Sequence, residues 1–334
     1  MSEAVTKTRD IQFYSICTTT YNCASVVEKS LQSIIKNADT PEMEFVVCDS
    51  KSNDGTPQLI AKFSKFFKEM KIISKKSTRG EGRQIAFENS TGQYIIRVDL
   101  DTVYNKSWKE FLKWYADNLP LFAVETYGSD IFPRKLVQAV GGWKGLNTAE
   151  DVDLYFKLAR IGKMKWSPLI TGYNLALLRT WEKIPSWTER WRRELVLFRD
   201  FMAIRMITLR QCIIRQRYNP FLTLFDFVAR IYAFTVPGVV NVRKLNRDIV
   251  ESNVIELPIE GYRGRGRESW WRWDFLSDTP IQSQVQDCLI CSCPVRLPEK
   301  YCPRCVSILK QENLLQEAGL SHLRNRETKP TFKR

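Results

Sequence analysis

Histidine is nearly absent from this chain: His322 is the only one among 334 residues. A single imidazole cannot build the two-histidine zinc site of an HExxH protease. His322 lies in a charged C-terminal stretch, which predicts an exposed side chain without a role. General acid and base chemistry is therefore expected to fall to carboxylates.

Long apolar runs are absent as well. The chain contains no 18 consecutive apolar residues, which disfavours an ordinary membrane-spanning helix. Its first nine residues are polar and lack the apolar centre of a secretory signal. We therefore expect a cytoplasmic protein, and peripheral attachment to the inner face of the cell membrane stays open as an alternative.

The first 180 residues alternate short apolar runs with segments of helical periodicity. Strands are predicted over 13–18, 45–48, 71–74 and 94–98, and helices over 24–36, from 56 and over 83–89. The second helix is expected to have Thr56 as its N-cap and Pro57 as its first residue. This alternation indicates an α/β fold with a mostly parallel sheet covered by helices on both faces. In such sheets ligands bind at the carboxyl ends of the strands.

Two aspartates follow the predicted strand over 94–98. Asp99 and Asp101 are two residues apart, so at a strand end their carboxylates point to the same side. Paired carboxylates suit Mg²⁺ or Mn²⁺, which leave coordination positions for substrate phosphates. A D-x-D pair alone is a weak signal, because loop aspartates are common after strands.

Five further short blocks of sequence, with a defined order and spacing, lie within residues 13–165. They are 16–22, 48–56, 83–94, Gly141-Gly142-Trp143 and 150–154. Together with the D-x-D pair, these blocks resemble those of family 2 glycosyltransferases with the GT-A fold. One departure is Lys51, which stands where the family commonly has glycine beside the nucleotide site.

The resemblance implies a nucleotide-diphosphate-sugar donor. Its nucleoside pocket would be lined by Thr18, Tyr21, Asp49 and Asp54. Asp49 would accept a hydrogen bond from the base.

The resemblance also implies how the diphosphate is held. Asp99 would hold the ribose or a metal-bound water, and Asp101 would ligate a Mn²⁺ or Mg²⁺ ion that bridges the diphosphate. Arg83 would add a cation there, unless it is an ordinary surface arginine of its helix.

The resemblance further implies that Asp151 is the general base, which takes the proton of the acceptor hydroxyl. Its place opposite the leaving group implies a single displacement with inversion. Glu150 would orient the acceptor or tune Asp151 through like-charge repulsion. The alternative is that Glu150, Asp151 and Asp153 are an acidic cluster that is favourable at a helix N-terminus.

The second half of the chain is basic and broadly apolar in places. Four arginines fall on one face of a long predicted helix: Arg192, Arg199, Arg210 and Arg217. A mostly apolar stretch over 221–240 follows. We expect these segments either to lie on an anionic membrane surface or to pack against the catalytic domain.

An arm rich in arginine and tryptophan follows over 263–273. Such a composition can stack on single-stranded nucleic acid, but no nucleic-acid-binding module is recognisable. A nucleic-acid partner is therefore disfavoured, and we favour tryptophans that anchor the arm on the core or on lipid headgroups.

Five of the nine cysteines gather near the C-terminus. Cys288 and Cys291, then Cys302 and Cys305, form two C-x-x-C pairs, which is the spacing of a four-thiolate zinc ribbon. Cys293 is an alternative ligand or a spare thiol. We expect this Zn²⁺ to be structural, since four thiolates leave no open position.

The chain is thus expected to divide into five parts. They are a catalytic domain over 1–185, amphipathic helices over 186–245, an Arg/Trp-rich arm over 246–284, a zinc ribbon over 285–312 and a charged tail over 313–334. The expected function is inverting glycosyl transfer from a nucleotide sugar to a hydroxyl or phosphate of a glycan or lipid-linked acceptor. The alternative is an inactive scaffold that binds partners or nucleic acid through the ribbon and the arm.

Overall fold

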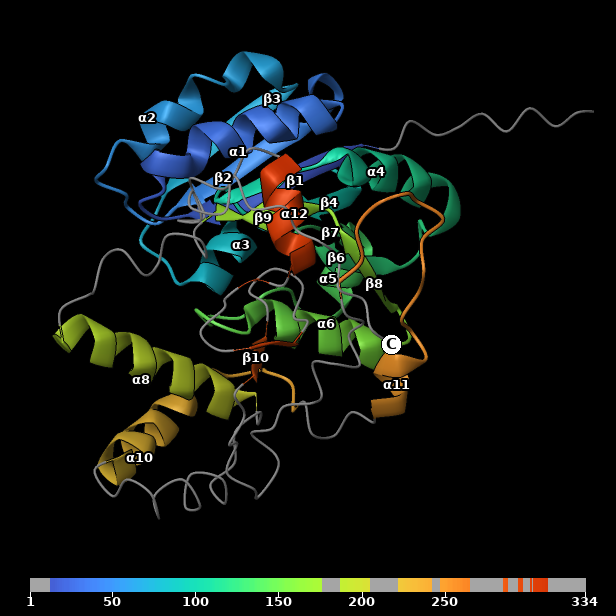
Figure 1. The fold of residues 1–334 in the computed structure, drawn as a ribbon. Helices are drawn as coiled ribbons and strands as arrows, with labels where there is room; N and C mark the ends of the chain where they lie inside the picture. The colour runs from blue at the N-terminus through green and yellow to red at the C-terminus, as the bar shows by residue number, and fades with distance from the viewer. Residues whose placement is uncertain are drawn as a thin grey trace, which may run out of the picture.

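A computed structural model describes most of the first half of the chain and parts of the second. The described residues are 13–175, 187–204, 222–241, 247–264, 285–287, 294–296, 301 and 303–311. At its centre lies a seven-stranded sheet in the order β3-β2-β1-β4-β7-β6-β8 (Figure 1). Its strands are β1 (Tyr14–Thr20), β2 (Glu44–Asp49), β3 (Glu69–Ser74), β4 (Tyr94–Arg97), β6 (Ala123–Tyr127), β7 (Asp130–Pro133) and β8 (Met164–Ile170).

The predicted mostly parallel sheet is confirmed, with one reversed strand. Strands β1 to β4 pair in parallel, as do β6 and β8, whereas β7 is antiparallel to both β4 and β6. Thr20 pairs with Asp49, which pairs in turn with Ser74, so three strands end at one level. The polar loops after these strands therefore meet at one edge of the sheet.

Helices cover both faces of the sheet, as predicted. They are α1 (Ala24–Asn37), α2 (Thr56–Ala61), α3 (Arg79–Glu88), α4 (Lys106–Asn118), α5 (Arg134–Ala139) and α6 (Glu150–Arg160), with 3₁₀ turns at Thr40–Glu42 and Ser64–Phe66. Neighbouring residues of β2 face opposite sides: Val46 joins Phe87 and Trp143 in one core, and Phe45 joins Trp108 in the other. The period of two along a fully buried strand builds both cores at once.

A short second sheet fixes the position of the D-x-D segment, residues 99–101. Strand β5 (Thr102–Tyr104) pairs antiparallel with β9 (Gly172–Asn174). This pairing brings the chain after β8 back beside residues 99–101, although 73 positions separate Asn174 from Asp101.

The prediction for the start of α2 is wrong. Thr56 is the first helical residue, and Gly55 before it adopts φ 87°. Asp54 caps the helix instead, because its Oδ1 accepts hydrogen bonds from Thr56 N at 3.1 Å and Thr56 Oγ1 at 2.6 Å. A carboxylate is the stronger acceptor for exposed helix N–H groups, and glycine permits the left-handed turn.

The helix predicted over 83–89 begins four residues earlier than expected. Thr78 accepts a hydrogen bond from Glu81 N, and the Glu81 carboxylate accepts one from Thr78 N, which forms a capping box. This early start places Arg79 one turn before Arg83.

Two helices of the second half pack on each other at one end of the molecule (Figure 1). They are α8 (Trp187–Ala203) and α10 (Leu222–Ala233), with a core of Phe198, Met202 and Ala229. Among the described residues no helix is both long and apolar enough to cross a membrane.

Arg199 of the predicted cationic face makes a packing contact. Its guanidinium donates to Asp200 Oδ1 at 2.6 Å, and the other Asp200 oxygen accepts from Asn147 N and Thr148 N at 2.7 and 2.8 Å. Helix α8 is therefore anchored to the loop that precedes α6. Arg210 and Arg217 lie outside the described residues, so the membrane-facing stripe stays a prediction.

The C-terminal cysteine cluster is described only in part. Strands β10 (Val285–Asp287) and β11 (Pro294–Arg296) form an antiparallel pair, and α12 (Pro303–Gln311) follows. Cys305 on α12 is fully buried and forms no disulfide. The other predicted zinc ligands, Cys288, Cys291 and Cys302, and the alternative Cys293 lie outside the described residues, as does His322. The short helix α11 (Arg247–Glu251) precedes this region.

Candidate active site

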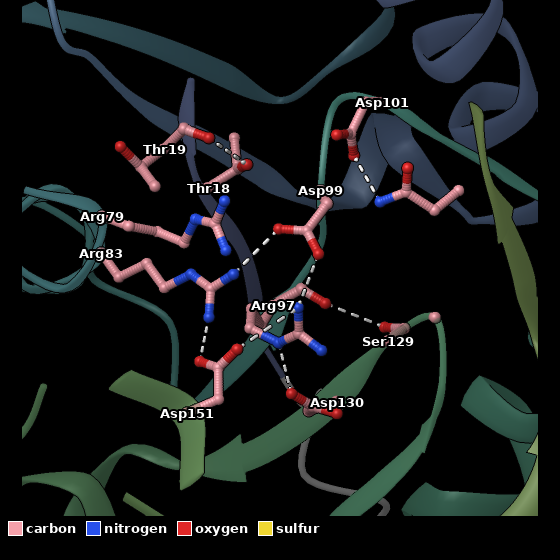
Figure 2. A network of polar contacts seen from close by, with 12 residues as sticks. Thr18, Thr19, Arg79, Arg83, Arg97, Asp99, Asp101, Ser129, Asp130 and Asp151 are labelled. Carbon is pink, nitrogen blue, oxygen red and sulfur yellow. Dashed lines mark hydrogen bonds and ion pairs between the residues drawn. The ribbon is translucent and has the colours of Figure 1, made fainter. Parts of the chain in front are cut away.

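Side chains from three elements meet at the carboxyl edge of the sheet (Figure 2). Arg97 is the last residue of β4 and Asp99 follows it, Arg83 comes from α3, and Asp151 lies in the first turn of α6. The structure thus brings together the predicted D-x-D, helix and Glu-Asp blocks.

These four residues form a closed cycle of alternating charge, which we call the charge ring. Arg83 Nη2 binds Asp99 Oδ1 at 2.9 Å, and Arg97 Nη1 binds Asp99 Oδ2 at 2.8 Å. Arg83 Nη1 pairs with Asp151 Oδ1, and Arg97 Nη1 lies 3.8 Å from Asp151 Oδ2. Each arginine therefore contacts both aspartates, and the ring itself carries no net charge.

Further groups surround the charge ring. Glu150 Oε1 lies 3.0 Å from Arg83 Nη1, and its side chain is only 3% exposed. On the opposite side, Arg97 Nε donates to the fully buried Asp130, which also accepts from Tyr155 Oη at 2.6 Å. The two arginines thus bind four carboxylates, so the whole cluster has an acidic excess.

Burial and ion pairing push the carboxyl groups in opposite directions. Burial alone would raise the pKa of Asp99, but Arg97 and Arg83 outweigh it and lower that pKa to about 2. Burial likewise opposes ionisation of Asp151, and Arg83 with Arg97 again lowers its pKa. For Glu150, burial dominates the attraction of Arg83 and raises the pKa to about 7. Asp151 is therefore ionised at neutral pH, whereas Glu150 is protonated in about half of the molecules at pH 7.

Asp101 has no arginine in direct contact within the described part of the chain. Asn174 Nδ2 of β9 donates to its Oδ1 at 3.1 Å, and Leu175 N donates to its backbone oxygen. Burial and the nearby charge of Asp99 raise the pKa of Asp101 to about 6. A half-buried carboxylate without a directly bound cation fits a divalent metal ion.

Among the described residues, Asp101 offers the metal a single carboxylate ligand. Within the described ranges, no group of three or more His, Cys, Asp or Glu side chains could hold a metal ion. Asp99 has both oxygens bound by arginines, which leaves Asp101 as the carboxylate of the D-x-D pair that can offer an oxygen. A Mg²⁺ or Mn²⁺ ion completed by substrate phosphates and water is compatible with this single ligand.

Trp143 explains why the glycine-glycine-tryptophan block accompanies the acidic motif. Its indole Nε1 donates to Asp151 Oδ1 at 3.1 Å, and its backbone N donates to Gln84 Oε1 at 2.9 Å. Gly142 has φ 61°, and a Cβ there would lie 2.1 Å from Gln84 Oε1. Gln84 and Gly142 therefore seat the tryptophan that orients Asp151.

The predicted nucleoside residues differ in their surroundings. Asp49 is fully buried and accepts from Ser52 N at 2.9 Å and Ser52 Oγ at 2.5 Å. Asp54 is used for capping, since its second oxygen accepts from Ala24 N at 2.9 Å. Thr18 is fully buried, whereas Tyr21 is 63% exposed. Tyr21 and Asp54 are therefore the exposed residues of this set, and Thr18 and Asp49 are the buried ones.

The loops that follow β1 and β2 are joined to each other. Asn22 N donates to Ser52 Oγ at 2.9 Å, and Asn53 N donates to Asn22 Oδ1 at 3.0 Å. Lys51 adopts φ 61° and Asn22 φ 49°, both in the left-handed region. Lys51 thus adopts a left-handed conformation that a glycine would take without strain.

Four charged or polar residues of the site were not predicted from the sequence: Arg79, Arg97, Asp130 and Asn174. Arg79 has a 57% exposed side chain, 3.9 Å from Glu150 Oε1, and its guanidinium lies beside that of Arg83 (Figure 2). Arg79 precedes Arg83 by four residues, so on a helix the two share one face, and this spacing could have predicted Arg79. Arg97 could have been predicted as well, because it is a charged residue at the end of an otherwise apolar strand. Asn174 gave no signal, since only the β5–β9 pairing brings it to Asp101.

The sequence model described as Glycosyl transferase family 2 matches residues 15–183. An uncharacterized glycosyltransferase of Haemophilus influenzae is 30% identical over 105 residues, which cover 31% of this chain and 32% of that protein. Poly(ribitol-phosphate) beta-N-acetylglucosaminyltransferase TarS of Staphylococcus aureus is 30% identical over 97 residues, 28% of this chain and 17% of TarS. The matches thus span about a third or less of these relatives.

Two solved structures show a looser likeness. TarS 1–349 of S. aureus in complex with UDP-GlcNAc gives a TM-score of 0.40 at 20% identity, covering 44% of this chain and 53% of that one. The mannosyltransferase PcManGT from Pyrobaculum calidifontis, in complex with GDP-Man and Mn²⁺, gives 0.45 at 19% identity and covers 67% and 73%.

Proposed function

This chain belongs to glycosyl transferase family 2, and we propose that it transfers a sugar from a nucleotide-diphosphate sugar to an acceptor hydroxyl or phosphate. The observation that carries the proposal is the charge ring. It joins the D-x-D segment, where a donor diphosphate would lie, to Asp151, where an acceptor would lose its proton. Donor and acceptor chemistry would thus share one rigid cluster.

On the donor side, Asp101 is the proposed ligand of a Mn²⁺ or Mg²⁺ ion. A metal bound there would supply positive charge to the leaving diphosphate. Arg79 would add a second cation from the protein, because its exposed guanidinium lies near Asp99, Asp101 and Glu150 and acts to lower the pKa of the three carboxyls. Asn174 would hold Asp101 in the orientation needed for the metal.

The nucleoside would lie over the loops after β1 and β2. Tyr21 is proposed to contact the ring of the base with its exposed face. Asp49 is the proposed hydrogen-bond acceptor for the base; because it is fully buried and Ser52 donates to both of its oxygens, a bound base would have to displace Ser52. Lys51 would bring a cation close to the base, where the family commonly has glycine. Thr18 would support this part of the site from the protein interior. Asp54 would hold the loop in place, since its carboxylate accepts from Ala24 N and Thr56 N.

On the acceptor side, Asp151 is the proposed general base. Its Oδ1 is held by Arg83 and by Trp143 Nε1. Its Oδ2 accepts no hydrogen bond from any of the described residues, and Arg97 lies 3.8 Å away. An ionised carboxylate with one oxygen fixed and the other accepting no hydrogen bond from a described residue can take the acceptor proton. Attack from this side, opposite the diphosphate, would invert the anomeric centre.

The acceptor is proposed to be a glycan or a lipid-linked compound. Helices α8 and α10 lie beyond the loop that leads into α6, and Asp200 and Val240 bind that region at Asn147, Thr148 and Asp153. An acceptor that contacts this helix pair would therefore be placed near Asp151.

Donor binding can be screened without knowledge of the acceptor. Melting temperatures would be measured with nucleoside diphosphates and their sugars, each with and without Mn²⁺. The proposal predicts stabilisation by one nucleotide series that grows with Mn²⁺, because ligands that bind only the folded state raise Tm. Release of the nucleoside diphosphate from the selected sugar would then report turnover with water as acceptor. Binding without any release would favour the inactive scaffold, and no binding by any nucleotide would refute the proposal.

A further inference from the structure

Arg97 is a charged residue at the end of a buried strand. All four residues of β4 are at least partly buried, and the Arg97 side chain is 9% exposed. A guanidinium can be buried at tolerable cost only when carboxylates or carbonyls compensate its charge. The side-chain contacts of Arg97 are with carboxylates of the protein, so its role lies in those contacts.

Asp130 alone would compensate the charge of Arg97. It is fully buried, it accepts from Arg97 Nε, and Tyr155 Oη holds it at 2.6 Å. The Arg97 backbone is fixed too, because its oxygen accepts from Ser129 Oγ at 3.0 Å. Arg97 is therefore held in place by Asp130 and Ser129, which are not part of the charge ring.

The other end of the guanidinium points into the charge ring (Figure 2). Nη1 binds Asp99 Oδ2 at 2.8 Å and lies 3.8 Å from Asp151 Oδ2, the oxygen proposed to accept the proton. Arg83 binds the same two aspartates from α3. Without Arg97, Asp99 would lose the contact at its Oδ2, and Asp151 would be held at Oδ1 alone, by Arg83 and Trp143.

We propose that Arg97, anchored by Asp130 and Tyr155, is a positioning residue that sets the separation and orientation of Asp151 relative to the D-x-D segment. This inference rests on the proposed function, in which Asp151 is the base. Arg97 touches neither donor nor acceptor in this role. Its removal should therefore reduce the rate of the chemical step more than the binding of the donor.

The test compares four proteins. Arg97→Met/Asp130→Asn removes the guanidinium and also neutralises position 130, so no unpaired buried charge remains there and the new amide oxygen can still accept from Tyr155. Arg97→Lys keeps the charge with a shorter reach. Arg134→Met is the matched control, since Arg134 binds Gly92 O and Ser90 Oγ near the start of the same strand, away from the charge ring. Wild-type protein completes the set.

Two quantities are measured on each folded protein: the Kd of the nucleoside diphosphate by calorimetry, and kcat for its release from the nucleotide sugar. We expect Arg97→Met/Asp130→Asn to lower kcat about 10- to 100-fold, the usual loss for a residue that orients a catalytic group. Its Kd should stay within about threefold of the wild-type value. Arg97→Lys should recover part of kcat, and Arg134→Met should change Tm alone.

Several outcomes would overturn the inference. They are a kcat of the double variant within about twofold of wild type, an equal loss of kcat in Arg134→Met, a loss confined to Kd, or no recovery in Arg97→Lys. Failure of the proposed function itself is seen separately, because wild-type protein would then bind or cleave no nucleotide sugar.

Discussion

Arg83 and Arg97 lie on different elements of the fold, yet each contacts both Asp99 and Asp151. Arg83 reaches the pair from helix α3, and Arg97 reaches it from the end of strand β4. Both elements are thereby tied to the first turn of α6. Substitutions around this cluster should therefore separate the role of each residue in it.

Asp151→Asn should abolish base catalysis and leave donor binding intact. Asparagine keeps the shape and the contact with Trp143 but cannot take a proton. General-base catalysis typically contributes ~10²–10⁴-fold, so single-turnover sugar transfer should slow by about that factor. Calorimetry with the nucleoside diphosphate should give a Kd close to that of wild type. Transfer at the wild-type rate would move the role of base to Glu150 or to the acceptor's own phosphate.

Asp101→Asn should instead weaken donor binding in a metal-dependent way. Loss of an outer-shell partner of a metal typically costs about 10–100-fold in affinity, and loss of the direct carboxylate should cost at least as much. The comparison is the Kd of the nucleoside diphosphate with Mn²⁺ and with a chelator. Wild type and variant should differ strongly with Mn²⁺ and converge without it. Equal affinities in the presence of Mn²⁺ would remove Asp101 as the ligand.

Arg79→Met should weaken diphosphate binding about tenfold, because a charge-assisted contact to phosphate is lost. A nucleoside without phosphates should bind both proteins equally. The matched control is Arg160→Met, which removes an exposed arginine at the far end of α6. An equal loss for nucleoside and diphosphate would contradict a contact between Arg79 and the phosphates.

Glu150 should make stability depend on pH. Burial raises its pKa from 4.5 to about 7, so the folded state binds a proton that the unfolded state has released. The stabilising contribution is fully present below pH 4.5 and is lost as the pH rises through about 7. Glutamine does not titrate, so the Glu150→Gln variant lacks this pH-dependent contribution to stability. The Tm difference, variant minus wild type, should therefore increase between about pH 5 and pH 8; a constant difference would contradict the raised pKa.

The C-terminal segment is predicted to hold one zinc ion per chain. Elemental analysis of protein purified without chelator should find about one equivalent. Metal binding would supply folding free energy that so short a segment cannot obtain from a core. Cys302→Ser/Cys305→Ser should lose the zinc and lower the stability of this segment. Metal content and Tm equal to those of wild type would refute the ribbon.

The amino-acid sequence alone predicted the features that depend on neighbouring residues. Strand–helix alternation predicted the sheet with helices on both faces, because burial on one or both sides imposes a local period. The spacing of Asp99 and Asp101 predicted two carboxylates at a strand end, for the same reason. Local reasoning still misplaced the start of α2, where Asp54 competed successfully with Thr56 for the role of cap.

Only the tertiary structure decided which charges meet. The contact of Arg97 with Asp130 needs β7 to lie antiparallel beside β4, and that of Asn174 with Asp101 needs β9 to return beside β5. These pairings join residues 33 and 73 positions apart in the chain. The energy of an ion pair depends on distance and burial, and neither can be read from the order of residues. The sequence therefore predicted Asp99, Asp101, Glu150 and Asp151, whereas Asp130 joins the site only through the pairing of β7 with β4. The fold determined which carboxylates bind arginine and which one can offer an oxygen to a metal ion.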